Sequence, residues 1–120
     1  MNVVDSSLWI EYLADTEKAD LVAATVENFE SLIVPSICLL EVYKIILRRG
    51  GEEKAVQASM AMCQGQVVSL DEELALRAAN SSLPLFASII WATAQAYNAT
   101  LWTMDSHFAG MPKVRYFSKT

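Results

Sequence analysis

The sequence predicts one α/β domain over residues 1–120, a three-layer α/β/α sandwich around a mostly parallel sheet of about five strands. Short β-branched runs alternate along the chain with longer segments of helical periodicity. This alternation favours a parallel sheet with helices on both faces. No linker, low-complexity tract or internal repeat divides the 120 residues, a length that supports a single core.

The first part of the chain contains two expected strands and two expected helices. Residues 2–5 form a strand, and residues 8–13 begin a helix after the turn that follows it. Residues 17–29 have apolar side chains at a helical spacing and predict a second helix. A short strand over residues 32–34 ends at Pro35, which lacks a backbone N–H for the sheet.

Capping and stop signals bound the elements that follow. Ser36 is expected to cap a helix that runs to Arg49, and Gly50 and Gly51 stop that helix. A helix at 71–80 opens with acids, which suit the positive end of the helix dipole. The other expected elements are helices at 52–62 and 85–97 and strands at 66–70, 100–104 and 113–117.

Charge restricts the classes of function. The chain has 9 basic and 14 acidic residues, a formal net charge of -5 and a pI near 4.7. Non-specific nucleic-acid binding calls for a basic surface, so this balance argues against it. An acidic protein can still cleave nucleic acid when cations neutralise a carboxylate pocket and a few local lysines and arginines hold the backbone.

The apolar content predicts interfaces rather than a membrane segment. Hydrophobic residues make up 53% of the chain, and the mean hydropathy is +0.27. No apolar run approaches the roughly 20 residues of a membrane span, and the start lacks the features of a secretory signal. We therefore expect a cytoplasmic protein whose excess apolar surface is covered in a homodimer or by a dedicated partner. Cys38 and Cys63 are expected to be buried free thiols.

Two aspartates follow expected strands. Asp5 ends the first apolar run and Asp105 ends the strand at 100–104. In open α/β sheets, ligands bind in the crevice beyond the carboxyl ends of the strands, so both positions suit metal or phosphate chemistry. Asp105 has an alternative role as the N-cap of the short turn at 106–108.

Glu41 is conspicuous because its charge falls within an apolar helical stripe. Ile37 and Ile45 stand at i−4 and i+4 from it. A carboxylate there must find a cation or hydrogen-bond donors. A surface ion pair with Lys44 or Arg48 is one interpretation, and a metal or water held between carboxylates is the other. If Glu41 meets the two strand-end aspartates, their mutual repulsion favours a divalent cation between them.

Three blocks of the chain resemble a known family in combination. They are Val3 to Leu13, Pro35 to Val42, and Leu83 to Asp105. Together they resemble the PIN-domain ribonucleases, and in particular the VapC-type toxins of bacterial and archaeal toxin–antitoxin pairs. The resemblance implies an α/β/α sandwich, a pocket of acids that binds Mg²⁺ or Mn²⁺, and cleavage of structured RNA such as tRNA or ribosomal RNA. It also implies neutralisation by a cognate antitoxin protein.

By matching position, the resemblance assigns roles to several residues. Three of the family's four acids are present as Asp5, Glu41 and Asp105, and neighbouring hydroxyls are implied at Ser6, Ser7 and Thr103. Asp5 and the fourth acid would hold the ion, with Asp105 bound directly or through water. Glu41 would orient or deprotonate the hydrolytic water. Basic residues that are candidates for RNA-backbone contacts, or equally for solubilising surface, are Lys44, Arg48, Arg49, Lys113 and Arg115.

The fourth acid is missing from this chain. In the family pattern an Asp follows the Leu83-Pro84-Leu85 block, and here Ala87 stands at its position. Loss of a direct ligand should weaken metal binding and misplace the attacking water. An engineered inactivating substitution and a naturally degenerate copy both explain Ala87, and the intact remainder of the motif favours the former.

Two other function classes stay open at this point. A catalytically inactive PIN-like module would bind a protein or RNA without cleaving it, which suits Ala87. A phosphoacceptor receiver domain also places acids at strand ends of a doubly wound sheet, and Asp71 could imitate its acceptor. A receiver would want a second acid beside Asp5, where this chain has Ser6 and Ser7.

Overall fold

In the computed structural model, which describes residues 1–120, five parallel strands form one sheet in the order β3-β2-β1-β4-β5. The strands are β1 (Asn2–Val4), β2 (Leu32–Pro35), β3 (Gln66–Val68), β4 (Thr100–Thr103) and β5 (Val114–Tyr116). The predicted fold class is confirmed, and the sheet is wholly parallel.

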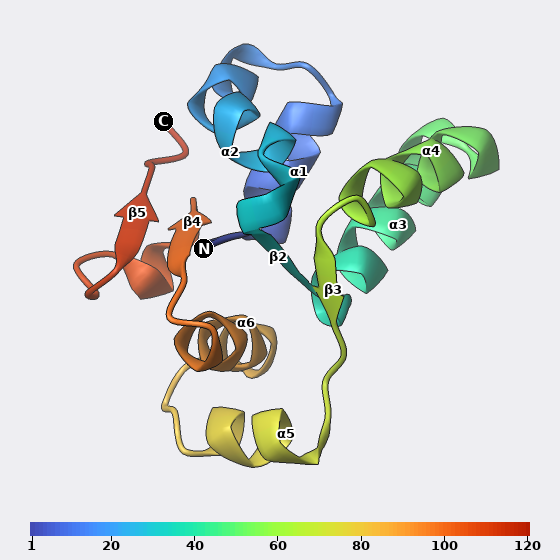
Figure 1. Ribbon diagram of the computed structural model, residues 1–120. Coiled ribbons are helices and arrows are strands. Elements are labelled where there is room, and N and C mark those ends of the chain that lie inside the picture. The colour runs from blue at the N-terminus through green and yellow to red at the C-terminus, as the bar shows by residue number, and fades with distance from the viewer.

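Helices cover both faces of this sheet. They are α1 (Ser6–Leu13), α2 (Ala23–Glu27), α3 (Ser36–Gly50), α4 (Glu52–Met62), α5 (Glu72–Ala79) and α6 (Leu85–Ala96). In Figure 1, α5 and α6 lie below the strands, whereas α1 and α2 lie above them and α3 and α4 lie to the right. The direction of winding reverses after β3, and right-handed crossovers then place α5 and α6 on the opposite face.

The reversal creates a switch point between β1 and β4. These two strands are neighbours, with Val4 paired to Trp102, although about a hundred residues separate them. Chains leave β1 and β4 toward opposite sides of the sheet, which opens a crevice beyond their carboxyl ends. Asp5 and Asp105 therefore stand on the two sides of this crevice.

The core explains why the central strands are apolar runs rather than alternating ones. Val3 and Val4 of β1 and Ile33 of β2 are fully buried, because helices cover both faces of the sheet. The edge strands are less protected, with Val67 of β3 and Tyr116 of β5 exposed. The site beyond β1 and β4 thus rests on strands of the buried core.

The predicted helix over residues 17–29 is wrong. The segment contains a 3-10 helix (Glu17–Leu21), then α2, then a second 3-10 helix (Phe29–Ser31). Val22 breaks the run with φ −123° and ψ −2° while its side chain is fully buried. The apolar spacing does place Val22 and Val26 in the core, but β-branched residues favour a continuous helix only weakly.

Two local predictions about capping and cysteines are also corrected. Ser36 is the first residue of α3 rather than its cap, and its Oγ accepts a hydrogen bond from the backbone N of Leu70. Gly51 ends the helix as expected, with φ +91°, a conformation that L side chains rarely adopt. Cys38 is buried, but Cys63 follows α4 and is exposed.

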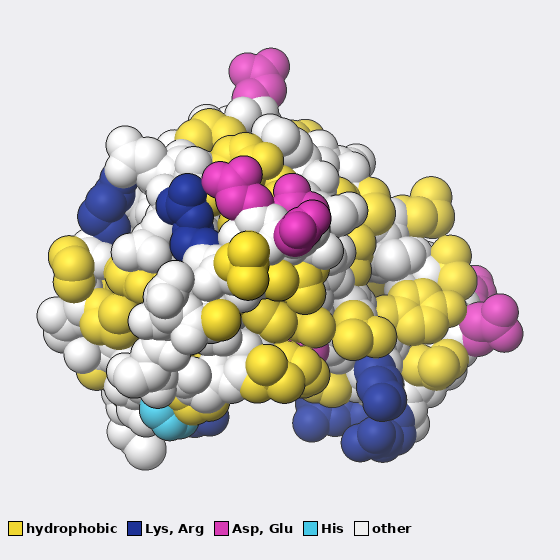
Figure 2. All heavy atoms as spheres, turned by 90° about the horizontal axis from the view of Figure 1, so that it is seen from below, with side chains coloured by type: hydrophobic (Ala, Val, Ile, Leu, Met, Phe, Trp, Pro, Cys, Tyr) yellow, Lys and Arg dark blue, Asp and Glu magenta, His cyan; other side chains and the backbone are white.

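Part of the apolar content remains on the surface. Figure 2 looks onto the α5–α6 side of the molecule, where hydrophobic side chains gather. Leu85 of α6 is 72% exposed and Leu76 of α5 64%, and Phe86, which follows Leu85, is also exposed. None of the helices combines the length and apolar character needed to cross a membrane.

Candidate metal centre

A cavity of about 280 Å³ lies beyond the carboxyl ends of β1 and β4. Acids from three separate parts of the chain line it: Asp5 after β1, Glu41 in α3 and Asp105 after β4. The other lining residues are Ser6, Ser7, Ile10, Ile45, Phe86, Ala87, Ile90 and Lys119. The apolar side chains among them lower the local dielectric and so strengthen the electrostatic interactions of the carboxylates.

Asp5 is the most constrained of the acids. Its side chain is 7% exposed and accepts hydrogen bonds from Ser6 N and Thr103 Oγ1, both at 2.7 Å. Burial raises the pKa of Asp5, and the nearby charges of Glu41 and Asp105 raise it further, while the two hydrogen bonds lower it. The folded protein therefore bears a free-energy cost for keeping this carboxylate charged without a cation beside it.

Glu41 reaches the cavity from α3. Its Oε1 accepts a hydrogen bond from Ser6 Oγ at 2.7 Å, which links α3 to the start of α1. The structure has no ion pair between Glu41 and either Lys44 or Arg48. The mid-helix carboxylate is thus directed toward the other acids rather than toward a surface cation.

Asp105 has both of the roles considered for it. Its Oδ1 accepts hydrogen bonds from the backbone N of His107 at 2.9 Å and from the ring Nδ1 of His107 at 2.7 Å, so it caps the Ser106–Phe108 turn. The same side chain lines the acid cavity. Its backbone N donates to Thr103 Oγ1, and this hydroxyl in turn donates to Asp5. Ser7 Oγ accepts from Met104 N and closes the network.

Cys38 belongs to this site, although the sequence analysis did not include it there. Its Sγ and one carboxylate oxygen each of Asp5 and Glu41 lie within 4.8 Å of one another. Burial raises the pKa of Cys38 well above its usual range, with the Asp5 charge as the next cause. A neutral thiol is a poor ligand for a hard cation, so Cys38 acts as packing beside the carboxylates. Its i+3 spacing to Glu41 on α3 was the available signal.

Ala87 faces the cavity from the first turn of α6. Its side chain is buried, and it lines the same space as the three acids. The N-terminus of α6 has neither an acidic residue in its first turn nor a side-chain cap, and Pro84 stands at the cap position. The positive end of this helix dipole is therefore without an anionic partner from its own first turn.

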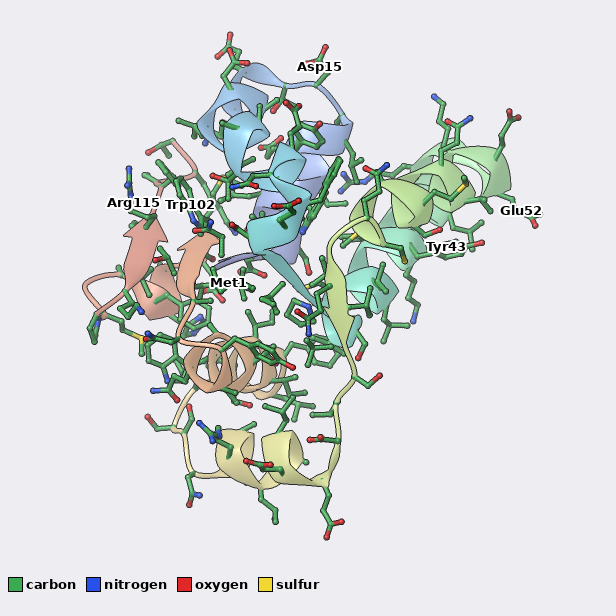
Figure 3. All side chains as sticks on the ribbon, viewed as in Figure 1. Met1, Asp15, Tyr43, Glu52, Trp102 and Arg115 are labelled. Atoms are coloured by element: carbon green, nitrogen blue, oxygen red, sulfur yellow. The ribbon has the colours of Figure 1, made fainter.

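The predicted RNA-contact residues are scattered rather than collected at the cavity. Lys44, Arg48 and Arg49 are exposed on α3, and dark blue side chains gather on that side in Figure 2. Lys113 Nζ donates to the backbone O and to Oδ1 of Asn98. Arg115 lies 4.9 Å over the ring of Trp102, side by side on β5 and β4 (Figure 3).

The basic residue that does line the cavity is Lys119, which the sequence analysis missed. It follows the last strand and belongs to no recognisable motif, so no local pattern pointed to it. Only the return of the chain beside β4 brings it to the acids.

The receiver-domain alternative is wrong. Asp71, its imagined acceptor, is exposed, caps α5 through a 2.9 Å hydrogen bond from Leu74 N, and does not line the acid cavity. The strand order β3-β2-β1-β4-β5 also differs from the 2-1-3-4-5 order of receiver folds.

The residues present fit a divalent cation. Asp5, Glu41 and Asp105 offer hard oxygen donors in one cavity, and Asp5 is a buried carboxylate without a basic side chain bonded to it. Mg²⁺ and Mn²⁺ prefer such oxygen ligands and are bound by few carboxylates together with water. Ala87, which lines the same cavity, stands where the family resemblance implies a fourth carboxylate, and that assignment stays a prediction.

We expect Asp5→Asn to stabilise the metal-free protein. The substitution removes a buried charge while keeping the side-chain shape, so the melting temperature in EDTA should rise by roughly 4 °C. The stabilisation that Mn²⁺ gives to the unaltered chain should disappear in this variant. Thermal melts followed by circular dichroism, with exposed Asp20→Asn as the control, measure both effects. A lower melting temperature in EDTA would show that the hydrogen bonds from Ser6 and Thr103 outweigh the cost of burial.

Comparison with known proteins identifies the family of this chain. The PIN domain family matches residues 3–114. A toxin–antitoxin complex from Klebsiella pneumoniae contains a chain that is 21% identical, with a TM-score of 0.82 over 98% of this chain and 99% of that one. VapC20 of Mycobacterium tuberculosis, a sarcin-ricin loop cleaving toxin, is 19% identical, with a TM-score of 0.76 over 96% and 99%.

A third similar structure is VapBC2 from Rickettsia felis bound to a DNA fragment from its promoter. It is 12% identical, with a TM-score of 0.71 over 98% of this chain and 97% of that one. No curated protein matches the chain. At these identities the solved structures show a shared fold, whereas the family match spans almost the whole sequence. This chain belongs to the PIN domain family.

Proposed function

We propose that this protein is a cytoplasmic endoribonuclease toxin that depends on Mg²⁺ or Mn²⁺ and cleaves structured RNA, tRNA or ribosomal RNA. The observation that carries the proposal is the convergence of Asp5, Glu41 and Asp105 on one cavity at the switch point of the sheet. Three carboxylates meet there without a basic side chain paired to Asp5 or Glu41, an arrangement that a divalent cation stabilises.

In the parent enzyme, with Asp at position 87, the side chains divide the work. A bound divalent ion would lower the pKa of a water and stabilise the charge on the phosphate. Asp5 and the residue at 87 would hold that ion, with Asp105 completing its surroundings. Glu41, held by Ser6 Oγ, would orient the attacking water and accept its proton. Thr103 and Ser6 keep Asp5 in one orientation.

Ala87 makes the chain as it stands a poor nuclease under this proposal. We therefore also consider that it acts as a binding module, which needs the fold and the RNA or protein surface but not the fourth acid. The two functions separate in one assay, cleavage of total tRNA and ribosomal RNA by the unaltered chain and by Ala87→Asp, with Mg²⁺, with Mn²⁺ and with EDTA. Cleavage by Ala87→Asp that EDTA abolishes supports the nuclease.

The proposed partners are a cognate antitoxin and a second copy of the chain. Toxin–antitoxin complexes are among the structures that this fold resembles. The exposed Leu76, Leu85 and Phe86 form an apolar surface on α5 and α6 that a partner would cover. Phe86 also lines the acid cavity, so an interface here would lie directly beside the site.

We expect the protein to be a homodimer at micromolar concentration and Leu85→Glu to make it a monomer. A charge in the centre of a desolvated apolar contact is costly, whereas Leu85 is 72% exposed in the isolated chain and its replacement should leave the fold intact. Sedimentation velocity and light scattering measure the mass of both proteins. Monomeric behaviour of the unaltered chain would contradict the expectation, and exposed Ala79→Glu on α5 is the control.

A further inference from the structure

Lys119 brings the one basic side chain that lines the acid cavity. It follows β5, and it lines the same cavity as the carboxylates that follow β1 and β4 and the one in α3. The cavity is otherwise lined by acids, hydroxyls and apolar side chains. Lys119 is therefore the only positive charge available inside it.

The segment that carries Lys119 is held in place on both sides. The backbone N of Phe117 donates to Thr103 O at 2.9 Å, and the Phe117 ring stacks on Trp102 with centroids 6.0 Å apart. Lys18 Nζ donates to the backbone O of Ser118 at 3.0 Å. These contacts fix the two residues before Lys119, so its reach over the cavity follows from the tertiary structure.

The Lys119 ammonium forms no ion pair with the acids of the cavity. The salt bridges of the structure join Arg77 to Glu73 and His107 to Asp105, and none includes Lys119. No hydrogen bond of its Nζ to another side chain occurs either. By contrast, the Nζ groups of Lys18 and Lys113 donate hydrogen bonds to backbone oxygens. Lys119 thus lines the cavity with a cationic side chain that is not paired with another side chain.

The charge balance of the cavity gives that group its role. Three carboxylates and one divalent cation leave a negative site, which repels a phosphodiester. Lys119 makes the same site neutral, and a Lys ammonium binds phosphate oxygens as a point charge. The apolar side chains of Ile10, Ile45 and Phe86 line the same cavity, and the lower dielectric that they give strengthens this attraction.

We propose that Lys119 Nζ contacts a non-bridging phosphate oxygen of the RNA at the acid cavity and is a substrate-binding residue of this protein. The inference rests on the proposed function for the identity of the substrate, but the phosphate contact itself does not require cleavage. It can therefore be tested on the chain with Ala87 as it stands.

The test measures binding of two probes in the presence of Mn²⁺. Inorganic phosphate is titrated by calorimetry, and a fluorescein-labelled single-stranded oligoribonucleotide is followed by anisotropy. Lys119→Ala should weaken binding of both probes roughly tenfold, the loss expected for one charge-assisted hydrogen bond. Lys119→Arg should retain most of the affinity, since it keeps the charge. Arg77→Ala, which removes an exposed cation of α5 that does not line the cavity, should change binding by no more than about twofold.

Further readouts separate this role from others. The melting temperature of Lys119→Ala should equal that of the unaltered chain, and its Mn²⁺ affinity should not fall, because a positive charge beside the acids is removed. Equal phosphate binding by Lys119→Ala and the unaltered chain, no phosphate binding by either, or equal losses in Lys119→Ala and Arg77→Ala would each overturn the proposal. Tighter Mn²⁺ binding by Lys119→Ala without any loss of phosphate binding would overturn it in favour of a counter-ion to the acids. Phosphate binding that depends on Lys119, combined with no RNA cleavage by Ala87→Asp, would retain the phosphate contact and refute the nuclease function.

Discussion

Ala87→Asp is expected to raise metal-dependent cleavage of structured RNA by at least roughly 100-fold over the chain as it stands. Loss of groups that merely support metal ligands costs about 10- to 100-fold, so a direct ligand should matter at least as much. Position 87 lines the acid cavity from the first turn of α6. This turn has no acidic residue to interact with the positive end of the helix dipole. A carboxylate there gains from the dipole and completes the ring of acids.

The measurement compares both proteins on total tRNA and ribosomal RNA with Mg²⁺, Mn²⁺ and EDTA. Ala87→Asn is the matched control, because it has the size of Asp without its charge and should stay inactive. The Mn²⁺-induced rise in melting temperature should also be larger for Ala87→Asp than for the unaltered chain. Equal cleavage by the unaltered chain and Ala87→Asp would show that position 87 does not hold the missing ligand. Inactivity of both on every RNA would favour the binding module.

If Ala87→Asp cleaves RNA as expected, adding Glu41→Gln to it should lower cleavage by on the order of 100-fold or more, the contribution of a positioned general base. Gln keeps the size of Glu and can still accept the hydrogen bond from Ser6 Oγ, so folding should be preserved. The amide cannot take a proton from the attacking water. Initial rates at saturating Mn²⁺, together with melting curves, separate the loss of chemistry from the loss of metal.

Glu53→Gln provides the control for Glu41→Gln. Glu53 is an exposed residue of α4 that does not line the cavity, so its replacement removes the same charge without touching the site. Unchanged cleavage by Glu41→Gln would refute the base assignment and leave Glu41 as a structural partner of Ser6. A large loss in both variants would indicate an effect of net charge instead.

The sequence predicts the elements in which a single local signal dominates. The apolar runs of β1 and β2 predict strands, and the acids at the start of α5 predict a helix. The predicted helix from Glu17 to Phe29 was wrong because the apolar residues at helical spacing belong to short helices that are separated by breaks. The predicted burial of Cys63 was also wrong, because this residue follows the end of α4 and is exposed.

Part of the candidate site could also be predicted from local sequence patterns, and part could not. Asp5 and Asp105 could be predicted because each ends a recognisable strand, and Glu41 because its charge interrupts an apolar stripe. Their roles in metal binding and catalysis stay predictions until the variants are measured. The scattered basic residues of α3 and β5 show the limit of reasoning from charge alone, because exposure on a helix does not reveal which cavity a side chain faces.

By itself the sequence determined the fold class and the two strand-end aspartates, because the pattern of neighbouring residues is enough to indicate them. A missing acid at Ala87 was inferred only from the family resemblance and stays a prediction. Only the tertiary structure decided that Cys38 lies beside Asp5 and Glu41 and that Lys119 lines the acid cavity. These meetings depend on strand order and on crossovers that join residues a hundred positions apart. Local periodicity reports how a segment folds, whereas the packing of layers determines which segments become neighbours.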